Sequence, residues 1–251
     1  MEAGHYQSLF DEQGYVFVSG ALELSKLSAF ENHISECAKK HLAQHHGSSI
    51  PESPPEILRT LSHADLPNFR LVCRNAGTSV AGLSLVLESR LLEAVSQISG
   101  RETSSLYPTT PAVFWNDPAT KQLHYDWHQE AAYYPDRKQS FHVWFPLFRD
   151  LERIDGPMVI CRGSHKQLFE YERVPVEGGL TQLRVDDSIA NQFEQVPCEL
   201  KRGDAILFHP NLIHKTLENQ SQIPRTSGIV RFFPLLEEPE YVPVLGPLAK
   251  A

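Results

Sequence analysis

The sequence predicts a mainly β fold with flanking helices, in which a double-sheet jelly roll or a similar closed β architecture carries the helices on its outside. From about residue 106, short apolar or alternating runs follow one another, each bounded by Gly, Pro, Asp or Asn: AVFWN, SFHVWFPLF, GPMVICRG, DAILFHP and SGIVRFF. Before that point, apolar residues recur at intervals of three and four, which is the period of a helix. Strands are therefore expected in the second part of the chain and helices in the first.

The helical part is expected over about residues 1–100 and contains one early strand, Tyr15–Gly20. The first helix ends near Gly47, and its apolar face consists of Leu24, Leu27, Phe30, Ile34, Ala38 and Leu42. A Pro- and Ser-rich connector, SSIPESPPE, follows. Two further helices are predicted after it, one around residues 57–76 and one over residues 80–98 that Gly100 stops.

The domain organisation follows from length and composition. All-β barrels and sandwiches routinely reach the length of this chain, 251 residues, without splitting. The sequence contains neither a linker between its helical and β parts nor an internal repeat. We expect one domain over residues 1–251, in which the helical part (about 1–100) packs on a β core (about 101–240).

Composition excludes several classes of partner. The formal net charge of −8 leaves no basic surface that could neutralise phosphates, so nucleic acid is not an expected partner and a small molecule is. No run approaches the roughly 18 apolar residues of a membrane span, and the N-terminus lacks a signal-peptide pattern, so we expect a cytoplasmic protein without membrane contact. The four cysteines form no CxxC pair and indicate neither a disulfide framework nor a zinc knot. The oligomeric state is not encoded in any recognisable pattern.

The segment QLHYDWHQEAAYYP, residues 122–135, contains candidate metal ligands. In an extended strand, residues two apart project from the same face, so His128 and Glu130 can reach one metal ion. The third ligand has to come from elsewhere, and the candidate is His214 in FHPNLIHKT. Two imidazoles and one carboxylate on one face of an octahedron are typical of non-haem Fe(II), because three positions stay open for a cosubstrate and O2.

A second pair in the same segment satisfies the same spacing. His124 and Asp126 form a literal HxD with the parity of His128 and Glu130. Spacing alone does not choose between the two pairs.

Downstream of His214 lie two candidate binding residues. Thr216 follows two residues later, so on a regular strand its hydroxyl faces the same side. Arg225 follows eleven residues after His214, and its planar guanidinium suits a carboxylate, which it can clamp with two parallel hydrogen bonds.

Four segments together resemble the phytanoyl-CoA dioxygenase-like family of Fe(II)- and 2-oxoglutarate-dependent oxygenases. They are GYVFVSGALELSKLSAFE, WHQEAAYYP, WFPLFRDLERIDGPMVICRGSHK and KRGDAILFHPNLIHKTLENQSQIPR. The resemblance implies a cupin-like double-stranded β-helix that holds Fe(II), with 2-oxoglutarate chelating the metal and its far carboxylate on Arg225. It also implies that O2 and 2-oxoglutarate yield succinate and CO2 while a substrate C–H bond is hydroxylated or otherwise oxidised.

The resemblance bears on individual residues as well. The residues around His128 match the family's proximal motif, which favours the pair His128 and Glu130 over His124 and Asp126. Asn116, twelve residues before His128 on a neighbouring strand, is a candidate hydrogen-bond donor to 2-oxoglutarate.

The chain departs from the family pattern at two positions. The family usually has Asp where Glu130 stands and Pro where Arg162 precedes Gly163. A carboxylate at position 130 argues against halogenating relatives, in which that ligand is absent. Two other functions stay open: a metal- or ligand-binding jelly roll without turnover, and a cupin-like enzyme that does not use 2-oxoglutarate. The identity of the substrate is not readable from these residues.

Overall fold

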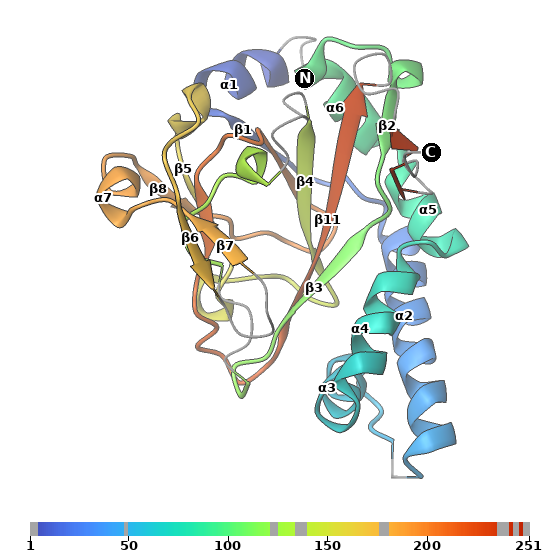
Figure 1. Cartoon of the computed structure of the whole chain (residues 1–251). Coiled ribbons are helices and arrows are strands. Elements are labelled where there is room, and N and C mark those ends of the chain that lie inside the picture. The colour runs from blue at the N-terminus through green and yellow to red at the C-terminus, as the bar shows by residue number, and fades with distance from the viewer. Residues whose placement is uncertain are drawn as a thin grey trace.

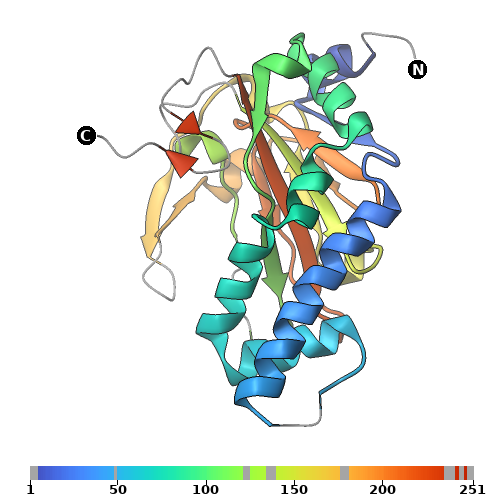
Figure 2. The same cartoon turned by 90° about the vertical axis from the view of Figure 1, so that its right-hand side faces the viewer.

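The computed structural model describes residues 5–47, 50–120, 125–133, 140–175, 181–234, 241–242 and 246–247. Two antiparallel sheets lie at the centre, and the large helices cover the outer face of one of them (Figure 1). Figure 2, which looks onto that side, shows the helices in front of the strands. The predicted fold class, a jelly roll with flanking helices, is confirmed.

The larger sheet runs in the order β1-β9-β4-β11-β2, and β3 also pairs with β11. Its strands are β1 (Tyr15–Val18), β2 (Leu106–Pro108), β3 (Ala112–Asn116), β4 (Phe141–Leu147), β9 (Ala205–Phe208) and β11 (Arg225–Pro234). The five apolar runs that predicted strands all fall on strands of the two main sheets. The early strand is confirmed as β1.

The smaller sheet has the order β10-β5-β8, formed by β5 (Met158–Cys161), β8 (Gln195–Pro197) and β10 (His214–Thr216). Two hairpin-like pairs complete the described β structure: β6 (Glu172–Pro175) with β7 (Thr181–Arg184), and β12 (Tyr241–Val242) with β13 (Gly246–Pro247). A short helix, α7 (Asp187–Ala190), lies between β7 and β8 in the chain.

Side-chain alternation along β4 separates two hydrophobic layers. Val143, Phe145 and Leu147 belong to the core shared with the helices, whereas Trp144 points to the opposite side. The layer that contains Trp144 joins the two sheets, and Met158 of β5 is part of it. The catalytic candidates lie on this inner side, between the sheets.

The helical part contains α1 (His5–Gln13), α2 (Leu24–His45), α3 (Pro54–Ala64), α4 (Leu66–Ala76), α5 (Val80–Val86) and α6 (Ser89–Ser99). The apolar face of α2 is buried as predicted, except that Leu24 at its first position is 51% exposed. Among the described residues, no helix combines the length and the apolar character that a membrane crossing needs.

Each of the two later helices was predicted as one continuous helix, and this was wrong because each is divided into two. The helix expected around residues 57–76 is broken at Asp65, whose carboxylate accepts a hydrogen bond from the Asn68 backbone N–H and caps α4. The helix expected over residues 80–98 is broken before Ser89, because the carboxylate of Glu88 caps α6. Gly100 ends α6 in the left-handed conformation, with φ 64°, as predicted. A capping side chain thus begins a new helix at each of these points, although the helical spacing of apolar residues continues across it.

Candidate active site

A cavity of about 300 Å³ lies between the two sheets. Aromatic and aliphatic side chains form most of its wall, and the polar groups gather around the candidate ligands. The residues lining it are Phe114, Trp115, Tyr125, His128, Glu130, Tyr133, Trp144, Met158, Phe208, His214, Thr216, Arg225, Ser227, Ile229 and Arg231. A site of this kind, apolar with a few convergent polar groups, is typical of small-molecule binding.

The two candidate histidines are brought together by backbone pairing. His128 and His214 form an antiparallel bridge, in which each backbone N–H donates to the carbonyl of the other at 3.0 Å. Their ring centroids are 4.1 Å apart. Because His214 begins β10, the segment around His128 extends the smaller sheet beyond that strand.

Each imidazole is held in one orientation by a backbone carbonyl. His128 Nδ1 lies 2.7 Å from the carbonyl oxygen of Asp126, and His214 Nδ1 lies 2.9 Å from that of Leu212. A carbonyl oxygen only accepts, so both Nδ1 atoms donate, and in the neutral imidazole Nε2 is then the atom with the lone pair. Both Nε2 atoms are 3.9 Å from Oε1 of Glu130. The three donor atoms lie within 4.8 Å of one another.

Glu130 reaches this cluster by a different route from the expected strand. Within the described residues of this segment, only His128 takes part in a bridge, and Glu130 begins a 3₁₀ turn, Glu130–Ala132. The prediction that a regular strand carries the pair was therefore wrong. The Ala131 backbone N–H donates to the carbonyl of Pro210 at 3.0 Å, which anchors the turn against the loop before β10.

The second carboxylate oxygen of Glu130 has a cationic partner. Arg231 Nη2 donates to Glu130 Oε2 at 2.9 Å. Burial opposes ionisation of Glu130, but the positive charge of Arg231 outweighs it and holds the Glu130 pKa well below its ordinary value. The carboxylate is thus ionised, with Oε1 facing the histidines and Oε2 facing the arginine.

Sequence reasoning missed Arg231 and His142. His142 Nδ1 lies 3.8 Å from Glu130 Oε2, and burial lowers the His142 pKa to about 3, so this imidazole is neutral. A signal for Arg231 was present in the sequence: it follows Arg225 by six residues on β11, and even spacing places both on one face of the strand. His142 had no comparable signal, because its proximity to Glu130 depends on how the segments meet.

Arg225 lies on the same cavity as the three candidate ligands. It is buried, and Nη1 donates to the carbonyl of Gly156. Burial lowers the Arg225 pKa to about 10, which still leaves the guanidinium charged at neutral pH. Its Nε is buried without a hydrogen-bond partner. Thr216, on β10, lines the cavity as well.

Asn116 and Asp126 do not line the cavity. Asn116 pairs with Arg225 in the β3–β11 register and is buried, with its Nδ2 lacking a hydrogen-bond partner, but it does not line the cavity. Asp126 is exposed and contributes its backbone carbonyl to His128 rather than its carboxylate. His124 lies outside the described residues.

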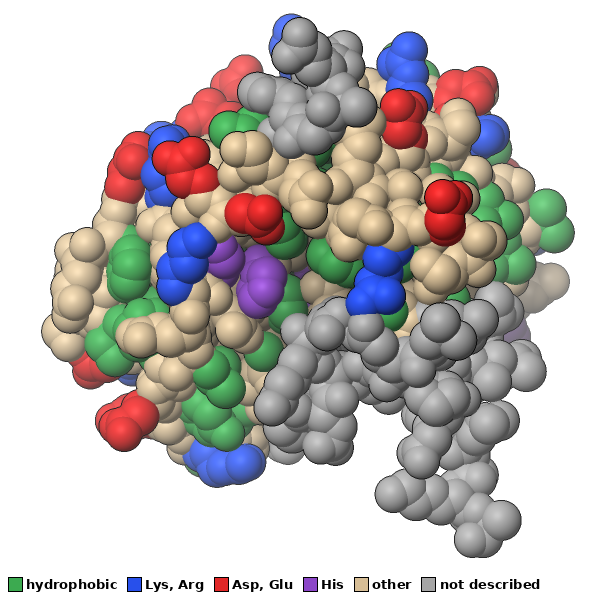
Figure 3. Space-filling view, turned by 90° about the horizontal axis from the view of Figure 1, so that it is seen from above, with side chains coloured by type: hydrophobic (Ala, Val, Ile, Leu, Met, Phe, Trp, Pro, Cys, Tyr) green, Lys and Arg blue, Asp and Glu red, His purple; other side chains and the backbone are tan. Residues whose placement is uncertain are grey.

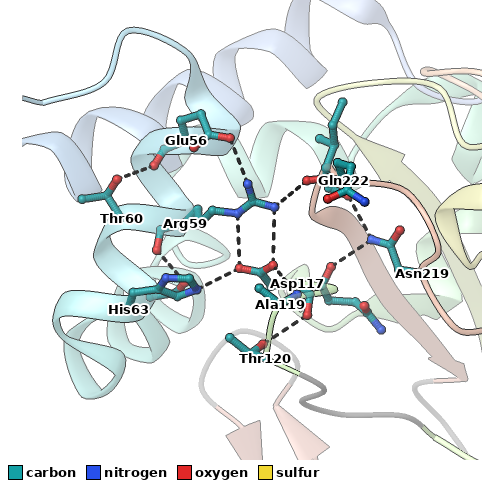
Figure 4. Close-up of polar contacts among 12 residues, drawn as sticks. Glu56, Arg59, Thr60, His63, Asp117, Ala119, Thr120, Asn219 and Gln222 are labelled. Carbon is teal, nitrogen blue, oxygen red and sulfur yellow. Dashed lines mark hydrogen bonds and ion pairs between the residues drawn. The ribbon is translucent and has the colours of Figure 1, made fainter.

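Side chains of helix α3 contact two segments next to this site (Figure 4). The Asp117 side chain is fully buried; its Oδ2 lies 3.3 Å from Arg59 Nε and 3.0 Å from His63 Nε2. Arg59 Nη2 also donates to the carbonyl of Gln222 at 2.7 Å. Asp117 follows β3, and Gln222 lies in the segment that links β10 to β11. One arginine of the helical part therefore ties together the two segments that flank Arg225.

Charged side chains of both signs lie on the face shown in Figure 3. On the face shown in Figure 3, acidic and basic side chains are interspersed, with histidine side chains visible among them.

Comparisons with known proteins point in one direction. The model of the family described as phytanoyl-CoA dioxygenase (PhyH) matches residues 10–227. A probable phytanoyl-CoA dioxygenase of Caenorhabditis elegans is 22% identical over 231 residues, which cover 85% of this chain and 69% of that protein. The human peroxisomal phytanoyl-CoA dioxygenase is 29% identical over 111 residues, which cover 42% of this chain and only 32% of that protein.

A solved structure extends the likeness to the fold. EctD from S. alaskensis, determined with 2-oxoglutarate and 5-hydroxyectoine, superposes with a TM-score of 0.59 at 17% sequence identity. The superposition covers 94% of this chain and 77% of EctD.

Proposed function

The chain belongs to the phytanoyl-CoA dioxygenase family of non-haem iron, 2-oxoglutarate-dependent oxygenases, and we propose that it hydroxylates or otherwise oxidises a C–H bond of a small molecule, with release of succinate and CO2. The observation that carries the proposal is the convergence of two imidazole nitrogens and a carboxylate oxygen on a cavity that also contains a buried, charged arginine.

The donor set fits Fe(II). His128 Nε2, His214 Nε2 and Glu130 Oε1 would hold the ion, since two neutral imidazoles and one carboxylate match the facial triad of non-haem iron oxygenases. When bound, the iron with 2-oxoglutarate and O2 supplies the oxidant for C–H cleavage. The backbone carbonyls on both Nδ1 atoms keep the imidazoles oriented for this role.

Arg225 is proposed to bind the far carboxylate of 2-oxoglutarate. A guanidinium that is buried yet charged gains most from an anionic partner, because the surrounding medium screens it weakly. The Thr216 hydroxyl is proposed to donate to the same carboxylate, and the Asn116 amide to support the cosubstrate from the neighbouring strand. The EctD structure, which contains 2-oxoglutarate on the same fold, supports a keto acid in this cavity.

Arg231 is proposed to position Glu130. Glutamate has one more rotatable bond than the aspartate of the family pattern, and the contact of Arg231 with Oε2 restricts that freedom while leaving Oε1 to the metal. The aromatic wall of the cavity suits a small molecule with an apolar part.

The proposal is tested with purified protein, Fe(II) and 2-oxoglutarate. Without O2, a visible charge-transfer band should appear when all three are mixed; under air, 2-oxoglutarate should be converted slowly to succinate even without substrate. A protein that binds Fe(II) but gives neither band nor succinate would be a binding jelly roll instead. An oxidation that continues after 2-oxoglutarate is removed would assign it to cupin-like enzymes that need no keto acid.

A further inference from the structure

A second group of metal-ligating side chains lies far along the chain from the active site. His41 is on the last turns of α2, His46 follows its end, and Asp65 stands between α3 and α4. In Figure 2 the lower end of α2 lies beside α3 and α4, at the bottom of the helical layer. Among the described residues, only this trio and the active-site trio bring three possible ligand atoms within 4.8 Å of one another.

The distances from the two imidazole nitrogens to the carboxylate oxygen are close to those between ligands of one metal ion. His41 Nε2 lies 3.1 Å from Asp65 Oδ2, and His46 Nε2 lies 3.8 Å from the same oxygen. Two ligands at a tetrahedral zinc ion, with bonds of about 2.0–2.1 Å, are about 3.3 Å apart. The corresponding carboxylate–imidazole distances at the active site are both 3.9 Å, so the carboxylate of the second cluster lies closer to its imidazoles. Its two imidazole rings are farther apart, with centroids 5.7 Å apart against 4.1 Å at the active site.

The carboxylate of Asp65 is prepared to act as a ligand. Oδ1 accepts from the Asn68 backbone N–H at 3.2 Å, and Oδ2 accepts from Asn68 Nδ2 at 2.8 Å. One direction on Oδ2 remains for the contact with His41, where a cation could replace the shared proton.

The side chains are accessible but not fully exposed. The exposed fractions of the His41, His46 and Asp65 side chains are 18%, 27% and 23%. An ion could therefore enter from solvent while keeping a coordination position for water. His45, one helical turn after His41, has its ring centroid 4.6 Å from that of His41 and is the nearest additional imidazole.

We propose that His41, His46 and Asp65 form a second metal site, for a borderline divalent ion such as Zn(II), separate from the iron site. Two imidazoles and a carboxylate suit Zn(II) because it accepts nitrogen and oxygen donors in a four-coordinate geometry. The ion joins the end of α2 to the start of α4 across the Pro- and Ser-rich connector. It stabilises the helical layer and takes no part in the oxidation.

The test counts Zn(II) bound per chain by equilibrium dialysis of the full-length protein, followed by metal analysis. The wild type is expected to bind two ions, one at each site. His46→Ala and His128→Ala are each expected to bind one, and the double variant none. His63→Gln is the matched control, since His63 is a half-exposed imidazole on α3 that contacts Asp117 instead of the trio, and it should bind two.

A second measurement follows stability and needs no activity. In the His128→Ala background, Zn(II) should raise the unfolding temperature, because an ion that binds only the folded state stabilises it. His46→Gln, which removes the ligand but keeps a polar side chain of similar reach, should abolish that rise. The proposal is overturned if His46→Ala and His46→Gln bind as much Zn(II) as the wild type, or if His63→Gln loses as much as they do.

Discussion

Replacement of Arg225 by methionine tests the proposed cosubstrate site. Methionine has a similar length, fills the same buried volume and removes the charge. In the protein without 2-oxoglutarate, two effects of the substitution on stability oppose each other. The carbonyl of Gly156 loses its hydrogen-bond donor, which costs about 1–3 kcal/mol. The desolvated cation disappears at the same time, which acts in the opposite direction. The free energy of unfolding is therefore expected to change by no more than about 1 kcal/mol.

The effect on 2-oxoglutarate binding should be much larger. Two charge-assisted hydrogen bonds contribute about 1.5–3 kcal/mol each, and about 1.4 kcal/mol corresponds to a tenfold change in affinity. We expect the dissociation constant of 2-oxoglutarate to rise by about 100-fold or more in Arg225→Met. Arg225→Lys keeps the charge but loses the paired geometry, so its loss should be intermediate, about tenfold.

The assay is an anaerobic titration of the Fe(II)-loaded protein with 2-oxoglutarate, followed by its charge-transfer absorbance, with metal affinity measured separately. Arg162→Met is the matched control, because Arg162 is an arginine paired with Glu194 at 3.1 Å that does not line the cavity. It should leave 2-oxoglutarate binding unchanged. The reasoning is refuted if Arg225→Met binds 2-oxoglutarate within about threefold of wild type, or loses metal affinity to the same extent.

Three further changes have defined outcomes. Thr216→Val removes one proposed hydrogen bond of about 1 kcal/mol. In the same titration it should raise the dissociation constant of 2-oxoglutarate about fivefold without lowering the unfolding temperature. In Gly228→Ala, the new Cβ would lie 2.3 Å from the Phe145 ring, so urea unfolding should show a loss of about 1–3 kcal/mol; an unchanged midpoint would contradict this packing. Cys37 is half-buried and the other three cysteines are buried, so a thiol reagent should label Cys37 first, and Cys37→Ser should remove that fast phase. Because α2 and the larger sheet share one hydrophobic core, near- and far-ultraviolet circular dichroism should report a single unfolding transition, as expected of one domain.

The sequence by itself determined the classes of the elements and the identities of the candidate ligands. Apolar runs bounded by turn residues correctly predicted β3, β4, β5, β9 and β11. A buried strand needs a short run of neighbouring apolar residues, and such a run can be recognised in the sequence alone. Spacing pointed to His128, Glu130, His214 and Arg225, and the resemblance then favoured His128 and Glu130 over His124 and Asp126, since motifs keep reactive residues at recognisable spacings. The structure places all four on one cavity, and their proposed roles await the experiments above.

Only the tertiary structure decided how Glu130 is held. The spacing of His128 and Glu130 suggested a strand, yet the carboxylate arrives from a 3₁₀ turn. Its orientation depends on Arg231, which is 101 residues away in the chain. The same holds for His41 and Asp65, which meet because two helix ends pack together. Local periodicity reports which side of an element is buried, whereas the partner of a buried charge is set by the way distant segments fold onto one another.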